Sequence, residues 1–186
     1  MTRAADEAGL RRAVRASPGL TILTGGQTGV DTYAALAALR AGLSVHLVFP
    51  AGYRQEDGNL TAARRRRLAG AAFHELSSAS FRYRTWTCVY LADAVLLLDP
   101  AGGAGCWETA RAAETLGRPL LVPEQLTAEQ AATWLRETRA RVLLVAGCRA
   151  SLLARKGKGR SLRTQLDGIM AGAREYSDML GPFGPS

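Results

Sequence analysis

Short apolar runs without alternation are the feature that most constrains the fold of this chain. The clearest is AVLLLD at residues 94–99, and LTILT at 20–24 and SVHLVF at 44–49 are similar. A strand with one face in water would alternate apolar and polar residues, and these runs do not. They therefore predict strands that are buried on both faces, as in a parallel sheet covered by helices on each side.

Helical patterns alternate with these runs along the chain. Further strands are predicted at residues 72–75, 119–122 and 141–145. Helices are predicted at residues 6–16, 31–41, 61–69, 81–91, 105–116, 127–138 and 162–179. Segments 50–59 and 154–160 contain glycine and no apolar periodicity, so they read as loops. This alternation predicts one α/β domain over residues 1–186, with a Rossmann-like, doubly wound, mostly parallel sheet and helices on both faces.

Composition narrows the class of protein. The 186 residues suffice for one domain with a substantial core, and no apolar run is long enough to cross a membrane. The first twenty residues lack the apolar stretch of a signal peptide. Cys88, Cys106 and Cys148 form no CxxC pair or Cys/His ligand spacing, which argues against a disulfide scaffold or a structural metal site. We therefore expect a cytoplasmic protein with no membrane partner and no bound metal ligated by the chain.

The net charge of +8 favours anionic partners, although a solvated, arginine-rich surface explains it more simply. The basic residues gather at 64–67 and 155–163. Nucleic-acid binding through the second cluster is disfavoured, because no aromatic residues are interleaved there to stack on bases. A phosphorylated small molecule is the partner that the charge and the loops described next favour.

Two glycine-rich segments each follow a predicted strand and open a predicted helix. They are GGQTGVD at residues 25–31 and PAGGAGC at 100–106. Ligands of doubly wound sheets bind beyond the carboxyl ends of the strands, where the strand order reverses. With a strand order of 3-2-1-4-5-6, the two loops would face each other there, with helix N-termini offering N–H groups to a phosphate. Neither loop has a GxGxxG fingerprint or a Walker lysine, so NAD binding and ATP hydrolysis are disfavoured.

Several side chains in and after these loops are candidate ligand contacts. Asp31 could accept from a ribose or pterin group, or only favour the helix dipole. Gln27 and Thr28 could donate to phosphate or molybdate oxygens. Arg84 is the cation most suited to grip an anion, because a guanidinium binds phosphate in a bidentate way. Arg54 lies with Glu56 and Asp57 in a long loop. Loops often carry binding residues, although the simpler interpretation is that these charged side chains are only solvated.

Five further side chains have mainly structural alternatives. Cys106 lies at a predicted helix start, which would lower its thiol pKa and suit a reactive or metal-ligating thiol, although a small loop residue is the simpler reading. Trp86 and Trp107 could stack on a base or pterin, and core packing of Trp107 is at least as consistent with the sequence. The isolated histidines His46 and His74 are expected to be structural.

The same segments resemble the molybdenum cofactor carrier-like family. The resemblance covers residues 20–155 and rests on motifs in family order. These are GGQTGVD at 25–31, PAGYRQEDG at 50–58, YRT at 83–85, ADA at 92–94, the second glycine loop, GRP at 117–119, VAG at 145–147 and RAS at 149–151. The family belongs to a Rossmannoid group with lysine-decarboxylase-like phosphoribohydrolases and DNA-processing protein A. The sequence departs from the usual family residues at Thr32, Cys88, Ala92 and Cys106, which leaves the identity of the ligand open.

The resemblance implies a nucleotide-like or pterin ligand, such as molybdenum cofactor, and a homo-oligomer. The residues that it and the loops assign to ligand binding are Gly25, Gly26, Gln27, Thr28, Gly29, Asp31, Arg54, Asp57, Arg84, Gly102, Gly103, Gly105, Cys106 and Thr109.

Whether the sequence predicts an enzyme depends on how one motif aligns. Phosphoribohydrolases of the wider group carry a PGGxGTxxE motif whose Glu serves N-glycosidic cleavage. Thr109 occupies that position here, and Glu108 comes one residue earlier. One residue turns a helix by about 100°, so Glu108 is expected to point elsewhere. The favoured function is therefore binding or carriage of a phosphate-bearing ligand. The alternative is an N-glycosidase for nucleoside monophosphates, with Glu108 and Arg84 as candidate catalytic residues.

Overall fold

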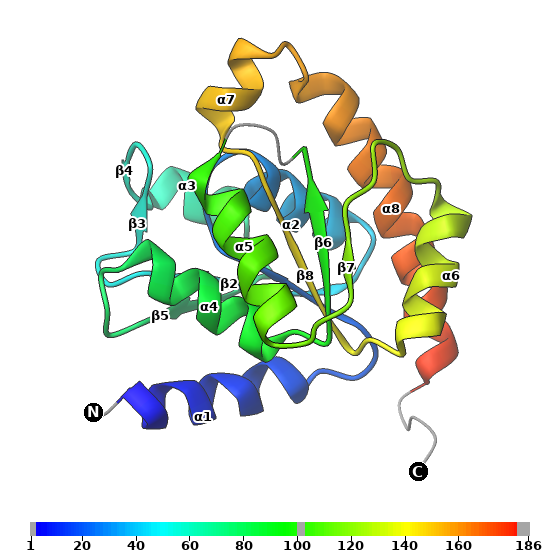
Figure 1. Ribbon diagram of the computed structural model, residues 1–186, viewed down its shortest axis with the longest axis horizontal. Helices are drawn as coiled ribbons and strands as arrows, with labels where there is room; N and C mark the ends of the chain where they lie inside the picture. Colours follow the sequence, from blue (N-terminus) through cyan, green and yellow to red (C-terminus); the bar gives the residue numbers. More distant parts are fainter. Residues whose placement is uncertain (1–2, 100–102, 182–186) are drawn as a thin grey trace.

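The computed structural model describes residues 3–99 and 103–181, which form a parallel sheet between two layers of helices (Figure 1). The six strands of the sheet are β1 (Thr21–Thr24), β2 (Ser44–Phe49), β5 (Ala72–Glu75), β6 (Ala94–Leu98), β7 (Leu120–Leu121) and β8 (Val142–Gly147). The helices are α1 (Arg3–Arg15), α2 (Val30–Arg40), α3 (Ala62–Arg67), α4 (Phe81–Leu91), α5 (Ala104–Thr115), α6 (Ala128–Thr138), α7 (Ala150–Arg155) and α8 (Gly159–Leu180).

The apolar runs of the strands fill two cores, one on each face of the sheet. Ile22 of β1 packs with α2, α6 and α8, whereas the next residue, Leu23, packs with α1, α4 and α5. Leu96 and Val95 of β6 divide in the same way. Successive side chains of a strand point to opposite faces, so a strand covered on both sides needs an apolar residue at every position. The predicted fold class, a doubly wound α/β sheet, is confirmed.

The predicted strand order is wrong. The sheet runs β5-β2-β1-β8-β6-β7, so the last strand lies between β1 and β6, and every pair in it is parallel. Leu144 of β8 is in register with Leu23 on one side and Val95 on the other. Strands that are apolar at every position offer similar surfaces to any parallel neighbour, so their chain order does not encode their order in the sheet. The two glycine loops are therefore separated by the carboxyl end of β8.

Local structure differs from the prediction in two segments. Residues 50–59, expected as a loop, contain a short antiparallel hairpin of β3 (Arg54–Gln55) and β4 (Gly58–Asn59). Helix α7 was not predicted, and α8 begins at Gly159, within the segment expected to be a basic loop. Both helices bury leucines, Leu153 of α7 and Leu162 of α8 among them.

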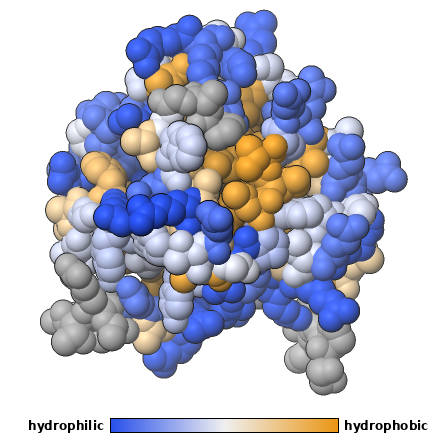
Figure 2. Space-filling view, in the orientation of Figure 1, coloured by the Kyte–Doolittle hydropathy of each residue, from blue (hydrophilic) through white to orange (hydrophobic). Residues whose placement is uncertain are grey.

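The surface is largely polar, with one apolar area over β6 and β7 on the face shown in Figure 2. Leu120 of the edge strand β7 and Val122 just after it are partly exposed. In the part of the chain that the structure describes, no helix is both long and apolar enough to span a membrane.

Candidate functional site

A pocket of about 350 Å³ opens at the carboxyl ends of β1, β8 and β6. Its wall includes the loop after β1, the first turns of α4 and α5, and the segment after β8. Eight of the predicted residues line it, namely Gln27, Asp31, Arg84, Gly103, Gly105, Cys106, Glu108 and Thr109. Gly25, Gly26, Thr28, Gly29, Arg54 and Asp57 are not in its lining, and Gly102 lies outside the described residues.

Asp31 and Arg84 form a buried ion pair at this pocket. Arg84 Nη1 lies 3.6 Å from Asp31 Oδ2, and the two side chains are 11% and 6% exposed. The Gln27 backbone N–H donates to the same carboxylate oxygen over 3.1 Å. Burial raises the pKa of Asp31 to about 6, although the Arg84 charge and the N–H groups of Gln27 and Gly25 oppose this rise. Arg84 Nε is buried and has no hydrogen-bond partner among the described residues, so one donor of the guanidinium is unsatisfied.

The glycines of the first loop shape the site without lining it. A Cβ on Gly25 would lie 1.2 Å from Arg84 Nη1, so only glycine admits the guanidinium there. Gly29 has a φ of 83°, and a Cβ on it would lie 2.4 Å from the Cys148 carbonyl oxygen. That oxygen accepts the N–H of Val30, the first residue of α2, over 3.0 Å. The loop can therefore lie directly against the end of β8.

Glu56 connects three parts of the pocket wall. Its carboxylate accepts hydrogen bonds from Thr28 Oγ1 and, over 2.8 Å, from Ser151 Oγ on α7. Arg149 Nε lies 3.5 Å from its Oε2. Thr28 thus acts on the pocket through Glu56, which itself lines the cavity.

Arg54 and Asp57, the two predicted ligand contacts in segment 50–59, do not line the pocket. Arg54 is exposed, with its guanidinium carbon 5.4 Å from the ring centroid of Phe81, which does line the cavity. Asp57 pairs with Arg64 instead, with Arg64 Nη1 2.8 Å from Asp57 Oδ1. The hydrogen bond from Arg64 holds the pKa of Asp57 below its usual value.

Glu108 does line the pocket, contrary to the prediction that it would point elsewhere. Its Oε1 accepts from Trp86 Nε1 over 2.5 Å and from Arg82 Nε over 2.9 Å, both on α4. The Trp86 hydrogen bond, with that of Arg82, lowers the pKa of Glu108, so the carboxylate is ionised at neutral pH. Thr109 donates to the Gly105 carbonyl over 2.9 Å, within its own helix. Both Glu108 and Thr109 therefore line the cavity, although they are neighbours on one helix.

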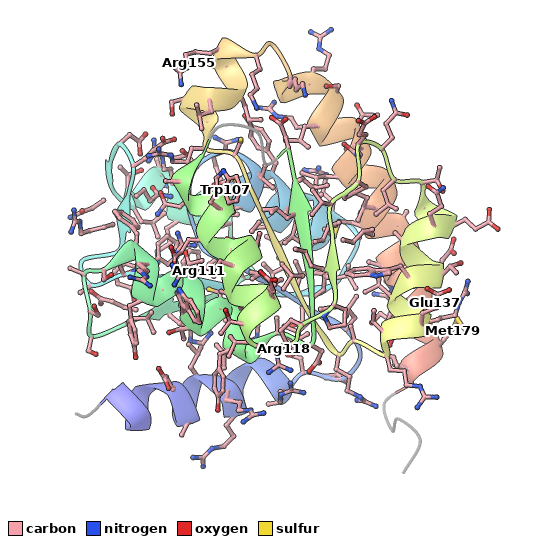
Figure 3. The ribbon with its side chains drawn as sticks, viewed as in Figure 1. Trp107, Arg111, Arg118, Glu137, Arg155 and Met179 are labelled. Atoms are coloured by element: carbon pink, nitrogen blue, oxygen red, sulfur yellow. The ribbon has the colours of Figure 1, made fainter. Side chains whose placement is uncertain are left out.

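The aromatic and histidine candidates have clear outcomes. Trp107 is 77% exposed on the surface of α5, so the core-packing alternative is wrong (Figure 3). His46 Nδ1 and His74 Nε2 lie 2.8 Å apart across β2 and β5, with nearly parallel rings. Neither histidine is in the lining of the pocket.

The predicted low pKa of Cys106 is wrong. The side chain is buried, and desolvation raises its thiol pKa to about 12, which outweighs its place in the first turn of α5. Cys106 is therefore a thiol at neutral pH. Among the described residues, no group of three or more His, Cys, Asp or Glu side chains is placed to hold a metal ion.

Sequence reasoning missed the contribution of β8. Ala146, Gly147, Cys148, Arg149 and Leu152 all line the pocket. The motifs VAG at 145–147 and RAS at 149–151 were visible in the sequence, but nothing local indicated that their strand lies between the two glycine loops.

The strand order explains why the pocket lies at β8. Suppose that β8 came before β1 in the chain. The strands β8, β1, β2 and β5 would then follow one another in chain order toward one edge of the sheet, and β6 and β7 would follow in chain order toward the other edge. This is a doubly wound sheet whose order reverses at β8, and ligands bind at such a reversal. The fold and pocket together define a Rossmann-like ligand-binding domain in which the chain order is permuted.

Comparison with known proteins agrees with this topology. The model of the Circularly permutated YpsA SLOG family matches residues 22–164, and the chain belongs to this family. It is also similar to the crystal structure of the Putative molybdenum carrier protein from Syntrophus aciditrophicus SB, with a TM-score of 0.66 and 23% identity over 82% of this chain and 96% of that chain. No curated protein matches. The family resemblance predicted from the sequence is confirmed.

Proposed function

We propose that this protein binds a small phosphate-bearing ligand of nucleotide or pterin type in the β8 pocket and carries it unchanged. The observation that carries the proposal is Arg84, a buried guanidinium in the pocket wall with an unsatisfied Nε. An unsatisfied buried donor is costly, and an anion in the pocket would relieve that cost. The first turns of α2 and α5 border the same cavity and would favour a negative charge.

The charges of the wall support a ligand with two chemically different ends. Arg84 and Arg82 are cations, whereas Glu56 and Glu108 are carboxylates. Carboxylates repel a phosphate but accept from hydroxyl or amino groups. Such a wall suits a phosphate joined to a donor-rich group, such as a ribose or an aminopterin. The volume of about 350 Å³ is within the range of small-molecule sites.

Molybdenum cofactor is the candidate suggested by the name of the similar carrier protein. In this proposal Arg84 would hold its phosphate, and Glu56 or Glu108 would accept from its pterin. The described residues offer no three-ligand cage, so the metal would keep the ligands that the cofactor itself supplies. A homo-oligomeric, cytoplasmic carrier is part of the same proposal.

An N-glycosidase acting on nucleoside monophosphates is the second candidate. It is favoured by Glu108, an ionised carboxylate in the pocket wall. A carboxylate there could stabilise the positive charge that develops on the sugar as the N-glycosidic bond breaks. The hydrogen bonds from Trp86 and Arg82 oppose this role, because they already satisfy one oxygen of that carboxylate.

Three measurements separate the two functions. Native mass spectrometry of freshly purified protein would detect a retained ligand, and calorimetry with nucleoside 5′-monophosphates would measure binding while chromatography measures released base. The carrier proposal expects binding or a retained mass, no released base, and at least tenfold weaker binding in Arg84→Gln, as for a lost charged hydrogen bond. Arg12→Gln, an exposed change on α1 with the same change in net charge, serves as the control.

Released base that disappears in Glu108→Ala would contradict the carrier proposal and establish the glycosidase. Binding that is equally strong in Arg84→Gln and in wild type would remove the basis of the carrier proposal.

A further inference from the structure

Two cysteines share one wall of the pocket. Cys106 lies in the first turn of α5, and Cys148 directly follows β8. Both line the cavity, and their sulfur atoms lie within hydrogen-bonding range of each other. Cys88 on α4 is as buried as Cys148 but is not in the lining. Of the three cysteines, only this pair combines a neighbouring thiol with access from the pocket.

The backbone fixes both sulfur atoms. The register of β6 and β8 places Leu98 opposite Gly147, and Cys148 Sγ consequently donates to the Asp99 carbonyl over 2.6 Å. A Cβ on Gly103 would lie 3.5 Å from Cys106 Sγ, which is an ordinary van der Waals distance. The backbone at Gly103 therefore lies next to the thiol without crowding it. Each cysteine lies on an element that bounds the cavity, and the hydrogen bond between the two side chains places them next to each other, which favours a reaction between them.

The charges around the pair distinguish its two members. Burial raises the pKa of both thiols. Lys156 Nζ lies 3.9 Å from Cys148 Sγ, and its positive charge opposes that rise for Cys148, whereas the Asp99 carboxylate, 3.0 Å from the same ammonium, adds to it by a smaller amount. The thiolate of Cys148 is thus the one that a neighbouring cation stabilises, and the thiolate is the reactive form of cysteine.

We propose that Cys106 and Cys148 form a reversible disulfide in the pocket wall, with hydrogen peroxide as the oxidant. The Cys148 thiolate attacks one peroxide oxygen, the O–O bond breaks, and the hydroxide that leaves takes a proton to become water. The Cys106 sulfur then attacks the resulting Cys148 sulfenic acid, and a second water leaves as the S–S bond forms. Two thiols are oxidised, and one peroxide is reduced to two waters. A dithiol such as dithiothreitol restores both thiols.

This modification joins the start of α5 to the end of β8, the two elements that bound the cavity. The inference goes beyond the proposed function and does not depend on which ligand the pocket binds. Peroxide is small enough to enter a cavity of about 350 Å³ and reach sulfurs that the outer surface hides.

The test is peroxide treatment of the whole protein followed by intact and peptide mass spectrometry under denaturing, non-reducing conditions. No lysine or arginine lies between residues 85 and 110, so trypsin leaves Cys88 and Cys106 on one peptide. The mapping is therefore done on Cys88→Ser as well as on wild type. We expect a loss of about 2 Da, a linked pair of peptides containing Cys106 and Cys148, and reversal by dithiothreitol. The reaction should be faster at pH 9 than at pH 7, because it needs a thiolate.

Cys106→Ser and Cys148→Ser should each abolish the loss of about 2 Da, whereas Cys88→Ser should retain it. Gain of about 16 or 32 Da without a linked peptide would overturn the proposal, since it would mean that the oxidised sulfur finds no partner. A linked peptide that contains Cys88 and persists in Cys106→Ser would overturn it too. Where a serine variant does not fold, fragmentation of the linked wild-type peptides by tandem mass spectrometry decides whether Cys88 or Cys106 is bonded to Cys148.

Discussion

Arg84 Nη1 and Asp31 Oδ2 lie 3.6 Å apart in the pocket wall, at a place that only glycine at position 25 leaves open. The pair is more than a fixed ion pair, because burial brings the pKa of Asp31 to about 6. As the pH falls through about 6, Asp31 takes up a proton. The ion pair, whose net charge is zero, then becomes a neutral carboxylic acid beside the positively charged Arg84. The positive charge available to an anion therefore depends on the state of Asp31.

Gly25→Ala should displace the Arg84 guanidinium, because the new Cβ would lie 1.2 Å from Nη1. We expect a loss of roughly 1–3 kcal/mol in unfolding free energy, typical of overpacking at a buried position. Urea unfolding followed by circular dichroism measures it. Gly105→Ala is the matched control in the second glycine loop, since its Cβ would meet no protein atom within 4 Å. Equal stability of the two variants would contradict the close approach of Arg84 to Gly25.

Asp31→Asn should remove a pH dependence of stability. The carboxyl has a pKa of about 6 in the folded protein, against an ordinary value of 3.8, so the folded state binds the extra proton between these values. Its favourable contribution is therefore complete below about pH 4 and is lost as pH rises through 6, by an amount of the order of 3 kcal/mol. The difference in unfolding free energy, Asp31→Asn minus wild type, should increase from pH 4 to pH 7. A difference that is flat with pH would show that Asp31 is not titrating there.

His46 should have the opposite effect. Burial, with a smaller contribution from His74, lowers the pKa of His46 from 6.5 to about 4. The unfolded state therefore binds the proton first, and stability is lost as pH falls from about 6.5 to about 4, by up to roughly 3 kcal/mol. His46→Gln should unfold with less acid dependence in this range than wild type. Denaturant titrations at several pH values test this, and an unchanged acid slope would contradict the assignment.

Glu56→Ala should loosen α7 while the sheet stays folded. It removes the acceptor of Thr28 and Ser151 and the partner of Arg149. Hydrogen bonds to a charged group contribute about 1.5–3 kcal/mol, so amide exchange in residues 150–155 should accelerate more than tenfold. Asp57→Ala, one residue further on, breaks only the exposed pair with Arg64 and should change exchange there little. If both variants leave α7 equally protected, Glu56 does not hold it.

The sequence predicted the elements well where the pattern is local. Helix α4 was predicted at its observed bounds, and Ser80 caps it, because its hydroxyl accepts the Tyr83 N–H over 3.2 Å. Helix α6, predicted at residues 127–138, begins with a capping box formed by Thr127 and Gln130. Such features depend on neighbouring residues only, so one sequence contains all the information that they need.

The candidate site was predicted in part. Glycine loops and Arg84 could be identified from residue types and motifs, and eight of the predicted residues do line one cavity. The contact between Glu56 and Ser151 joins residues 95 positions apart, and no local pattern indicates it. The environment of Glu108 depends in the same way on Trp86 and Arg82 from another helix.

By itself the sequence determined an α/β domain with strands buried on both faces, the helix caps, and the glycines that let the backbone turn tightly. Only the tertiary structure decided that β8 lies between β1 and β6, that Cys148 therefore reaches Cys106, and that the Cys106 thiol has a raised pKa. The reason is physical. Periodicity and capping arise from adjacent residues, whereas strand order, burial and pKa arise from packing between segments that the chain itself keeps far apart.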